Sequence, residues 1–195
     1  MKRAFDVFFS IIIIISFSPI FLITSILIKI ENFKLPVLFI QIRTGRNNIP
    51  FKIYKFRSMI NLDDNKNSIT IGQDSRITKI GKYIRKFKID ELPQFFNVLI
   101  GNMSVVGPRP EIPEFTQIYN DEQSTVLSLK PGITDHASIK YFNESKLLAN
   151  SNNPSKTYAE KIMPEKLNLN IEYVKNHSIY GDIKIILFTV IRVFK

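Results

Sequence analysis

The amino-acid sequence predicts a mainly α-helical protein with a small β-hairpin, preceded by an apolar segment that anchors it to a membrane. Three observations support this prediction. No charged residue occurs from Val7 to Ile28, two β-rich segments flank a turn near Gly45, and most later segments place apolar residues at helical spacing. The length of 195 residues suits one domain together with an anchor.

The charge balance and the missing residue types narrow the possible functions. Lys and Arg number 27 against 17 Asp and Glu, a net charge of +10 that attracts nucleic acid, anionic lipid head groups or phosphorylated substrates. The chain has no cysteine, which excludes disulfides, thiolate zinc sites and cysteine nucleophiles. The two histidines, His136 and His177, are far apart, so a metal would need oxygen ligands, which favours Mg²⁺, Mn²⁺ or Ca²⁺.

The apolar N-terminal segment is long enough for a membrane helix. Its 22 residues extend roughly 33 Å as a helix, against a hydrocarbon core of roughly 30 Å. A cleaved signal peptide is disfavoured, because the run is too long and no small-residue cleavage site follows. Pro19 can break the helix near its middle, and hydroxyls such as that of Ser18 can satisfy the freed carbonyls. Basic residues flank both ends. A kinked spanning helix and a re-entrant hairpin both fit these features.

A β-hairpin and a basic helix are expected after the anchor. The segments Val37–Arg43 and Pro50–Arg57 are apolar and β-rich, with turn residues between them. The polar segment Asn61–Ser75 lacks periodicity and is expected to be a loop. Ile77–Lys88 combines apolar residues at helical spacing with five basic residues. Its basic side is either a solvated face or a surface that lies on anionic head groups.

Helices are also expected in most of the remaining chain. The predicted segments are a helix that starts at Asp90-Glu91 and ends at Gly101, Glu111–Leu129, Tyr158–Asn176 and Asp182–Val193. The prolines of Val105–Pro110 predict a rigid loop, and Lys130-Pro131-Gly132 should end the helix before it.

The adjacent acids Asp90 and Glu91 are the strongest candidates for chemistry. A helix N-terminus favours ionised carboxylates, and neighbouring residues do not share a helix face, so the two acids could have different roles. One could attack phosphorus, as aspartate does in some ATPases, while the other holds a divalent cation. Arg85 and Arg109 could contact phosphate oxygens. On these residues alone, a purely structural helix start remains the more common explanation.

A longer block surrounds these acids. It comprises Ile84–Leu99 (IRKFKIDELPQFFNVL) and then Gly101–Pro110 (GNMSVVGPRP). This block resembles the signature of the bacterial sugar transferases, and more closely that of the small monotopic phosphoglycosyl transferases. Similar stretches extend the resemblance over nearly the whole chain: Lys2–Asp6, Ser18-Pro19, Phe39–Gly45, Lys55–Met59 and Lys130–Thr134. The chain departs from the family after Thr134, where Asp135-His136 replace a frequent Gly-Trp pair, and this change bears on the donor sugar if that loop faces it.

The resemblance implies an activity with assigned residues. The chain would transfer a sugar 1-phosphate from a UDP-sugar to undecaprenyl phosphate and release UMP, with Asp90 as the nucleophile that carries the phosphosugar. Glu91 would bind Mg²⁺. The remaining site residues would contact phosphates or order the loops, and they are Arg85, Arg109, Arg57 and Lys55.

The resemblance also implies a membrane arrangement. Ser18-Pro19 would break a re-entrant hairpin formed by residues 1–34, which contacts phospholipids without crossing the bilayer. Residues 35–195 would form a compact catalytic domain at the membrane interface, on the cytoplasmic face of the bacterial inner membrane.

Two rival functions make different demands on the sequence. A transferase of bare sugars would need a Gly-rich nucleotide turn, which the seven scattered glycines do not provide. A membrane-anchored protein that binds anionic lipid or nucleic acid without catalysis could use the same positive charge, but it would not need Asp90-Glu91. We therefore expect no nucleic-acid partner. The donor sugar, the pathway and the oligomeric state stay open, with a dimer as one alternative.

Overall fold

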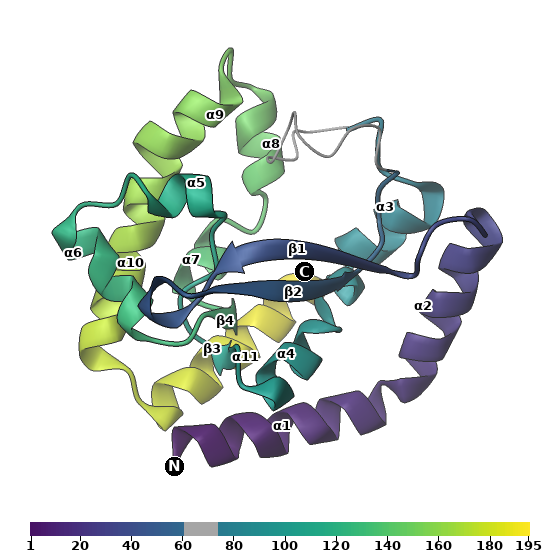
Figure 1. Cartoon of the computed structure of the whole chain (residues 1–195), viewed down its shortest axis with the longest axis horizontal. Helices are drawn as coiled ribbons and strands as arrows, with labels where there is room; N and C mark the ends of the chain where they lie inside the picture. Colours follow the sequence, from purple (N-terminus) through teal and green to yellow (C-terminus); the bar gives the residue numbers. More distant parts are fainter. Residues whose placement is uncertain (61–73) are drawn as a thin grey trace.

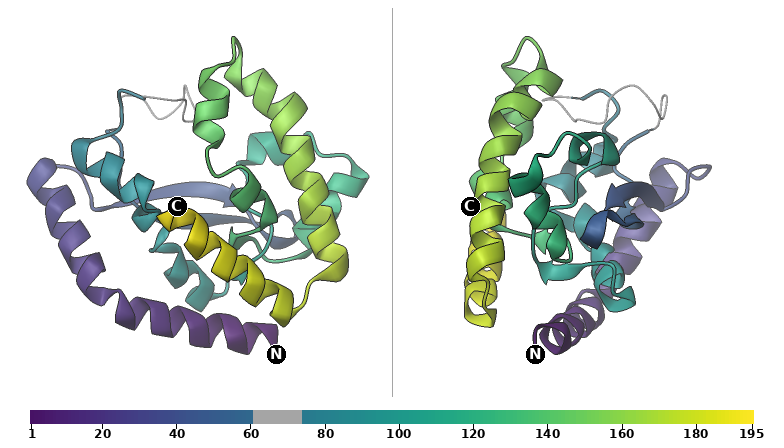
Figure 2. Two further views of the ribbon diagram at one scale, coloured as in Figure 1. Left: turned by 180° about the vertical axis from the view of Figure 1, so that it is seen from behind. Right: turned by 60° about the vertical axis from the view of Figure 1, so that its left-hand side comes forward.

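The computed structural model of the chain describes residues 1–60 and 74–195. Within this part, the expected mainly helical fold with a small hairpin is confirmed. Strands β1 (Leu38–Thr44) and β2 (Pro50–Phe56) lie on one face of the molecule, and helix α11 (Ile179–Phe194) crosses the opposite face (Figures 1 and 2). Short helices and a second β pair lie between these faces. The loop expected at Asn61–Ser75 lies outside the described residues except for its last two.

The N-terminal segment forms two helices that meet at an angle. Helices α1 (Lys2–Ser16) and α2 (Ser18–Glu31) are bent by 60° relative to each other. The Ser18 hydroxyl donates a hydrogen bond of 2.8 Å to the carbonyl of Ile15, so the serine satisfies a carbonyl at the break as expected. Pro19 lies in the first turn of α2, where an N–H has no helical partner. In the described part of the chain, no helix alone has the length and apolar character to cross a membrane, but this bent pair meets both requirements jointly.

The start of α1 is fixed to the rest of the domain by polar contacts. The buried carboxylate of Asp6 accepts hydrogen bonds from the Ser104 hydroxyl (2.9 Å) and the Val105 N–H (3.1 Å). The Lys2 ammonium lies 2.6 Å from a carboxylate oxygen of the buried Asp182, at the start of α11. Helix α1 is therefore part of the folded domain at its N-terminal end.

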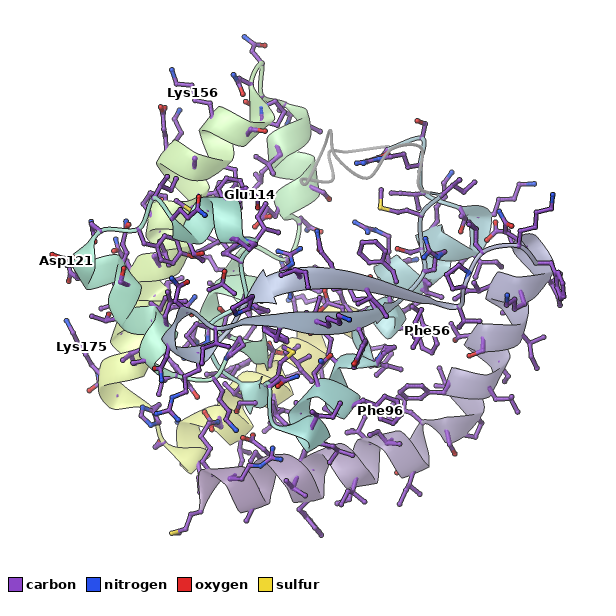
Figure 3. The ribbon with its side chains drawn as sticks, in the orientation of Figure 1. Phe56, Phe96, Glu114, Asp121, Lys156 and Lys175 are labelled. Atoms are coloured by element: carbon purple, nitrogen blue, oxygen red, sulfur yellow. The ribbon has the colours of Figure 1, made fainter. Side chains whose placement is uncertain are left out.

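Aromatic side chains attach α2 to the domain. The ring of Phe21 lies 5.5 Å from that of Phe56 and 5.7 Å from that of Phe96, between centroids. Figure 3 shows Phe56 and Phe96 in the space between the hairpin, the helix that carries Phe96 and the bent pair. Such tilted and edge-to-face contacts stabilise by about 0.5–1.5 kcal/mol each beyond burial. The bend at Phe17 thus has packing support on its inner side.

The hairpin presents one edge to helix α4 (Gln94–Ile100). Its register pairs Leu38 with Phe56 and Thr44 with Pro50, close to the expected strands. The fully buried Asn97 of α4 accepts a hydrogen bond from the N–H of Tyr54 (3.0 Å) and donates one to the carbonyl of Lys52 (2.7 Å). This amide covers backbone groups that an edge strand would leave unpaired.

A short parallel pair replaces part of the expected rigid loop at Val105–Pro110. Strand β3 (Ser104–Val106) lies beside β4 (Gly132–Thr134), directly after the proline that breaks the chain. Gly107 and Gly132 allow the two segments to approach closely, because a Cβ built on Gly132 would lie 2.1 Å from the Gly107 nitrogen. Both segments are therefore restricted to glycine at the point where they cross.

The single helix expected at Glu111–Leu129 is wrong. The segment forms α5 (Pro113–Thr116), α6 (Asp121–Ser124) and a 3₁₀ turn at Thr125–Ser128. Asn120 explains the interruption, because its side chain and that of Gln123 form a reciprocal capping box that begins a new helix.

The other helices agree in place but differ in their bounds. The expected basic helix is α3 (Lys79–Lys86), and the last two expected helices are α10 (Met163–Asn176) and α11. A π-helical turn at Tyr158–Ile162 precedes α10. Three short helices had not been predicted: α7 (His136–Lys140), α8 (Glu144–Ala149) and α9 (Pro154–Thr157).

Candidate active site

The two candidate acids lie in a 3₁₀ turn rather than in a helix. The turn spans Ile89–Glu91 and connects α3 to α4, which begins only at Gln94. Lys88, just before the turn, has a left-handed backbone with φ 56° and ψ 19°. Both acids are buried. Their side chains have different surroundings, as expected for neighbours with different roles.

Glu91 is held by two cations from distant parts of the chain. The Arg109 guanidinium donates to both carboxylate oxygens, at 2.6 Å to Oε1 and 3.3 Å to Oε2. The Lys55 ammonium on β2 lies 3.2 Å from Oε1. Burial alone would raise the pKa of Glu91, but Arg109 and Lys55 outweigh it and hold this pKa well below its usual range. The structure therefore brings three of the predicted site residues together.

Asp90 has the opposite environment. Its Oδ1 atom is buried and has no hydrogen-bond partner among the described residues. Burial raises the pKa of Asp90 and the adjacent Glu91 raises it further, although Lys55 and Arg85 act in the other direction. The sequence suggested that a helix dipole would favour ionisation of both acids, but for Asp90 burial outweighs any such effect. A buried carboxylate oxygen without a donor is poorly stabilised and available to react.

Arg85 and Arg57 lie in different places. Arg85 lies near enough to Asp90 to affect its pKa, and its guanidinium contacts the sulfur of Met59 at 3.7 Å. Arg57 donates to the backbone carbonyl of Pro36 at 2.9 Å, and its guanidinium lies 5.8 Å from the ring centre of Phe39. These contacts place Arg57 at the base of the hairpin. A role of either arginine in phosphate binding stays a prediction.

The backbone of the Arg109 loop is fixed by two other segments, the end of strand β1 and the residues around Asp135. The Asp135 carboxylate accepts the Arg109 N–H at 3.3 Å, and the Arg43 guanidinium donates to the Pro110 carbonyl at 3.3 Å. The Thr44 N–H donates to the carbonyl of Glu111, the residue after Pro110, at 2.9 Å. Asp135 is fully buried and also caps α7 by accepting the Ser138 N–H at 2.6 Å. His136, its neighbour, is exposed.

A second ionic cluster lies behind this loop. The ammonium of the buried Lys166 on α10 lies 2.9 Å from Glu144 and 3.6 Å from Glu111, and it also donates a hydrogen bond of 3.1 Å to the Tyr158 hydroxyl. The Tyr158 hydroxyl donates to Glu111. Because Glu111 follows the Arg109 loop directly, this cluster ties the loop to α10. The sequence did not indicate a site role for Arg43 or Lys166, and it singled out Asp135 only as part of the loop that departs from the family.

Among the described residues, the site has too few acidic side chains to surround a metal ion by itself, but it has enough to share Mg²⁺ with substrate phosphates and water. No group of three or more Asp, Glu or His side chains that could hold a metal occurs in residues 1–60 and 74–195. Mg²⁺ is commonly held by one or two carboxylates together with substrate phosphates and water, so a large protein cage is not required. The free Oδ1 of Asp90 and the weakly bonded Oε2 of Glu91 provide such donors. Mg²⁺ binding stays a prediction.

Comparisons with known proteins agree with the resemblance. One relative is the UDP-N-acetylgalactosamine-undecaprenyl-phosphate N-acetylgalactosaminephosphotransferase of Aeromonas hydrophila, 37% identical over 196 residues, which cover 97% of this chain and 43% of the relative. The UDP-glucose:undecaprenyl-phosphate glucose-1-phosphate transferase of Klebsiella pneumoniae is 38% identical, over 99% of this chain and 40% of its own length. The uncharacterized sugar transferase EpsL of Bacillus subtilis (strain 168) is 37% identical, over 99% of this chain and 87% of its own length.

The relatives differ in how much of their own length this chain covers. The chain spans only about two fifths of the first two relatives, so their activities are not carried over to it directly. The sequence profile described as "Bacterial sugar transferase", however, matches residues 1–195 in full. The buried Asp-Glu pair and the Arg109 loop that holds it thus lie in a chain that belongs to the bacterial sugar transferase family.

Proposed function

We propose that this chain transfers a sugar 1-phosphate from a UDP-sugar to undecaprenyl phosphate, as an early membrane step in the synthesis of a surface polysaccharide or glycoconjugate. The substrates are those named for the relatives from Aeromonas hydrophila and Klebsiella pneumoniae. The observation that carries the proposal is the difference between the contacts of Asp90 and those of Glu91. Glu91 is fixed by Lys55 and Arg109, whereas Asp90 keeps a buried oxygen without a partner.

In the first step, Asp90 acts as the nucleophile. A carboxylate oxygen forms a bond to the phosphorus that carries the sugar, and the bond from this phosphorus to the bridging oxygen breaks. UMP leaves with the electron pair, and the phosphosugar remains on Asp90. A desolvated carboxylate suits this step, because it gives up no hydrogen bond when it reacts.

In the second step, an oxygen of the lipid phosphate attacks the same phosphorus. The bond from phosphorus to the Asp90 oxygen breaks, the electron pair returns to the carboxylate, and the lipid-linked diphosphate sugar is formed. Arg109 holds Glu91 in place in both steps, and its charge attracts phosphate to the site. Glu91 would hold Mg²⁺ together with phosphate oxygens, and the ion would neutralise the charge of those phosphates.

The membrane arrangement is part of the proposal. The bent pair α1–α2 would enter the bilayer as a re-entrant hairpin, with residues 35–195 on the cytoplasmic side. Its 60° bend and the satisfied carbonyl at Ile15 support this arrangement. Large apolar side chains remain exposed along both helices: Phe8, Ile11, Ile12, Ile15, Leu22, Ile23, Ile26, Leu27 and Ile30. Exposed Lys79, Lys82 and Lys86 on α3 would contact anionic head groups.

The experiment follows the covalent intermediate. The full chain in detergent with lipid is mixed with Mg²⁺ and a panel of UDP-sugars, and intact mass and UMP release are measured. We expect a phosphosugar adduct with one donor and lipid-linked product after undecaprenyl phosphate is added. Asp90→Asn should abolish the adduct, while Asp121→Asn, a change of an exposed acid on α6, should not. An active Asp90→Asn protein, or the absence of UMP release with every donor, would refute the proposal and favour a binding protein.

A further inference from the structure

A pocket opens beside Glu91, toward the face that carries α11. It is a small hollow with a cavity volume of about 100 Å³, below the roughly 300–1,000 Å³ of a typical small-molecule site, so it suits a compact group such as a phosphate. Glu91 and Arg109 form one side of it, and Thr189 and Arg192 of α11 form another. Its remaining walls are mostly apolar and include Leu92, Phe95, Ile133, Ile139 and Phe142.

Two cations border this pocket without a close ion pair to an acid of the described residues. The Lys88 ammonium lies 5.0 Å from the ring centre of Phe142, and the Arg192 guanidinium lies 5.6 Å from the same ring centre. Neither forms an ion pair with a carboxylate of the described residues, since Glu91 is already taken by Lys55 and Arg109. The Nε of Arg192 is buried and has no hydrogen-bond partner there. Asp90 and Glu91 lie near enough to Lys88 for its charge to lower the pKa of each acid, but neither forms an ion pair with it, so two neighbouring cations without a direct ionic contact remain to attract an anion.

The backbone at Lys88 is a separate sign of function. A lysine with φ 56° lies in the left-handed region, which costs about 1–3 kcal/mol unless the surrounding structure requires it. This conformation occurs directly before the turn that carries the two acids. Such strain tends to occur where a side chain must be directed into a functional site.

The chemistry of the walls indicates what kind of anion fits. Thr134, Ser138 and Thr189 add polar groups to the lining, but the hollow is too small to enclose a whole nucleotide sugar. The outer side of α11 is apolar and exposed at Leu187, Phe188, Val190, Ile191 and Phe194. A lipid that carries one phosphate matches both features, because its head group needs cations and its chain needs an apolar path.

We propose that Lys88 and Arg192 form a clamp for the phosphate of the lipid acceptor, with the hydrocarbon chain leaving along α11. This inference rests on the proposed function and assigns the acceptor subsite within it. The clamp would place the lipid phosphate on the side of Glu91 that faces away from Lys55. The UDP-sugar would then approach Asp90 from the side of strands β1 and β2, and the lipid phosphate would approach from the side of α11.

Direct binding tests the clamp without turnover. Undecaprenyl phosphate and undecaprenol are titrated separately into the full chain in detergent, and bound lipid is quantified by native mass spectrometry. The unmodified chain should bind the phosphate at least about tenfold more tightly than the alcohol. Lys88→Gln and Arg192→Gln should each weaken phosphate binding by about tenfold, the effect of losing one charge-assisted hydrogen bond. Arg192→Lys should retain most of the preference, which controls for a fold defect.

A matched control lies on the same helix. Lys184 is exposed on α11 with its ammonium over the ring of Tyr180 at 4.4 Å, so Lys184→Gln removes the same charge outside the pocket. This variant should bind like the unmodified chain. Equal losses for Lys184→Gln and Arg192→Gln, or no loss for Arg192→Gln and Lys88→Gln, would overturn the clamp.

Kinetics separate the clamp from the activity itself. For Arg192→Gln, kcat/KM for undecaprenyl phosphate should fall about tenfold, whereas kcat/KM for the UDP-sugar should change by less than about twofold. A selective loss for the UDP-sugar would instead assign these cations to the donor and overturn the clamp. A chain that binds the lipid phosphate through Arg192 but never releases UMP would refute the proposed function and leave the clamp supported.

Discussion

Neutralising each of the two adjacent acids should change stability in opposite directions. Glu91→Gln keeps the size of the side chain but removes the charge that Arg109 and Lys55 contact at 2.6 and 3.2 Å. Breaking a buried pair by removing one partner typically costs about 3–5 kcal/mol. The Arg109 side chain retains 30% exposure, so the lower end applies, about 3 kcal/mol. For a domain of this length, that loss lowers Tm by about 6–12 °C.

Asp90→Asn should have the reverse effect. Folding buries the Asp90 carboxylate without a partner for Oδ1, and burial raises its pKa. An uncharged side chain of the same shape avoids that penalty. We expect a gain of about 1 kcal/mol, which raises Tm by about 2–4 °C, together with loss of activity.

The pH dependence gives these two changes different signatures. The folded pKa of Glu91 is depressed, so its contribution is fully present above the usual value of 4.5 and is lost as pH falls through the folded pKa. The folded pKa of Asp90 is raised, so its penalty appears as pH rises above 3.8 and is complete above the folded pKa. Differential scanning fluorimetry of the three proteins from about pH 2 to 8 measures both effects, because the loss of the Glu91 contribution lies below pH 4.5. If both variants lose the same stability at neutral pH, the assignment of opposite environments is wrong.

Further outcomes follow from the same contacts. The rate of adduct formation should fall toward acid pH with an apparent pKa above 3.8, because Asp90 must be ionised to attack; a pH-independent rate would contradict this. Asp135→Ser keeps a helix cap but loses the contact with the Arg109 N–H, so kcat should fall about tenfold, and the loss should disappear in an Arg109→Ala background. Asp6→Ala leaves the buried Val105 N–H without its acceptor, although the Ser104 hydroxyl can still donate to the Val106 carbonyl, and should cost about 1–3 kcal/mol in thermal unfolding. Pro19→Ala should straighten the bent pair, so that a cysteine at position 2 becomes labelled by an impermeant reagent in intact cells, unlike in the parent chain.

Much of the fold could be predicted because local signals agree with the tertiary structure. The hairpin has β-rich strands around turn residues, and the break at Ser18-Pro19 follows from the chemistry of proline and serine. The single helix predicted at Glu111–Leu129 does not form, because the side chains of Asn120 and Gln123 cap the start of a new helix inside this segment. The short helix at His136–Lys140 has a similar signal, an aspartate three residues before a serine, which is too common to be decisive alone.

The site could be predicted only as far as neighbouring residues define it. The pair Asp90-Glu91 is visible in the sequence, but its division is not, because it depends on Lys55 and Arg109 arriving from other segments. The cations at Lys88 and Arg192 are 104 positions apart and meet only through folding. The left-handed backbone at Lys88 has no sequence signal, since lysine rarely adopts it.

The contacts of Glu91 offset the free-energy cost of burying the carboxylate of Asp90. A buried carboxylate without a partner, such as Asp90, is tolerated only where neighbouring contacts offset its cost. Glu91 provides that offset in the adjacent position, because its contacts with Arg109 and Lys55 stabilise the turn that carries both acids. The Arg109 loop is in turn held by Asp135 and by strand β1, so the guanidinium cannot easily move to Asp90 and quench it. Loosening this loop should therefore reduce reactivity by satisfying Asp90, even though no group that touches the phosphorus has been changed.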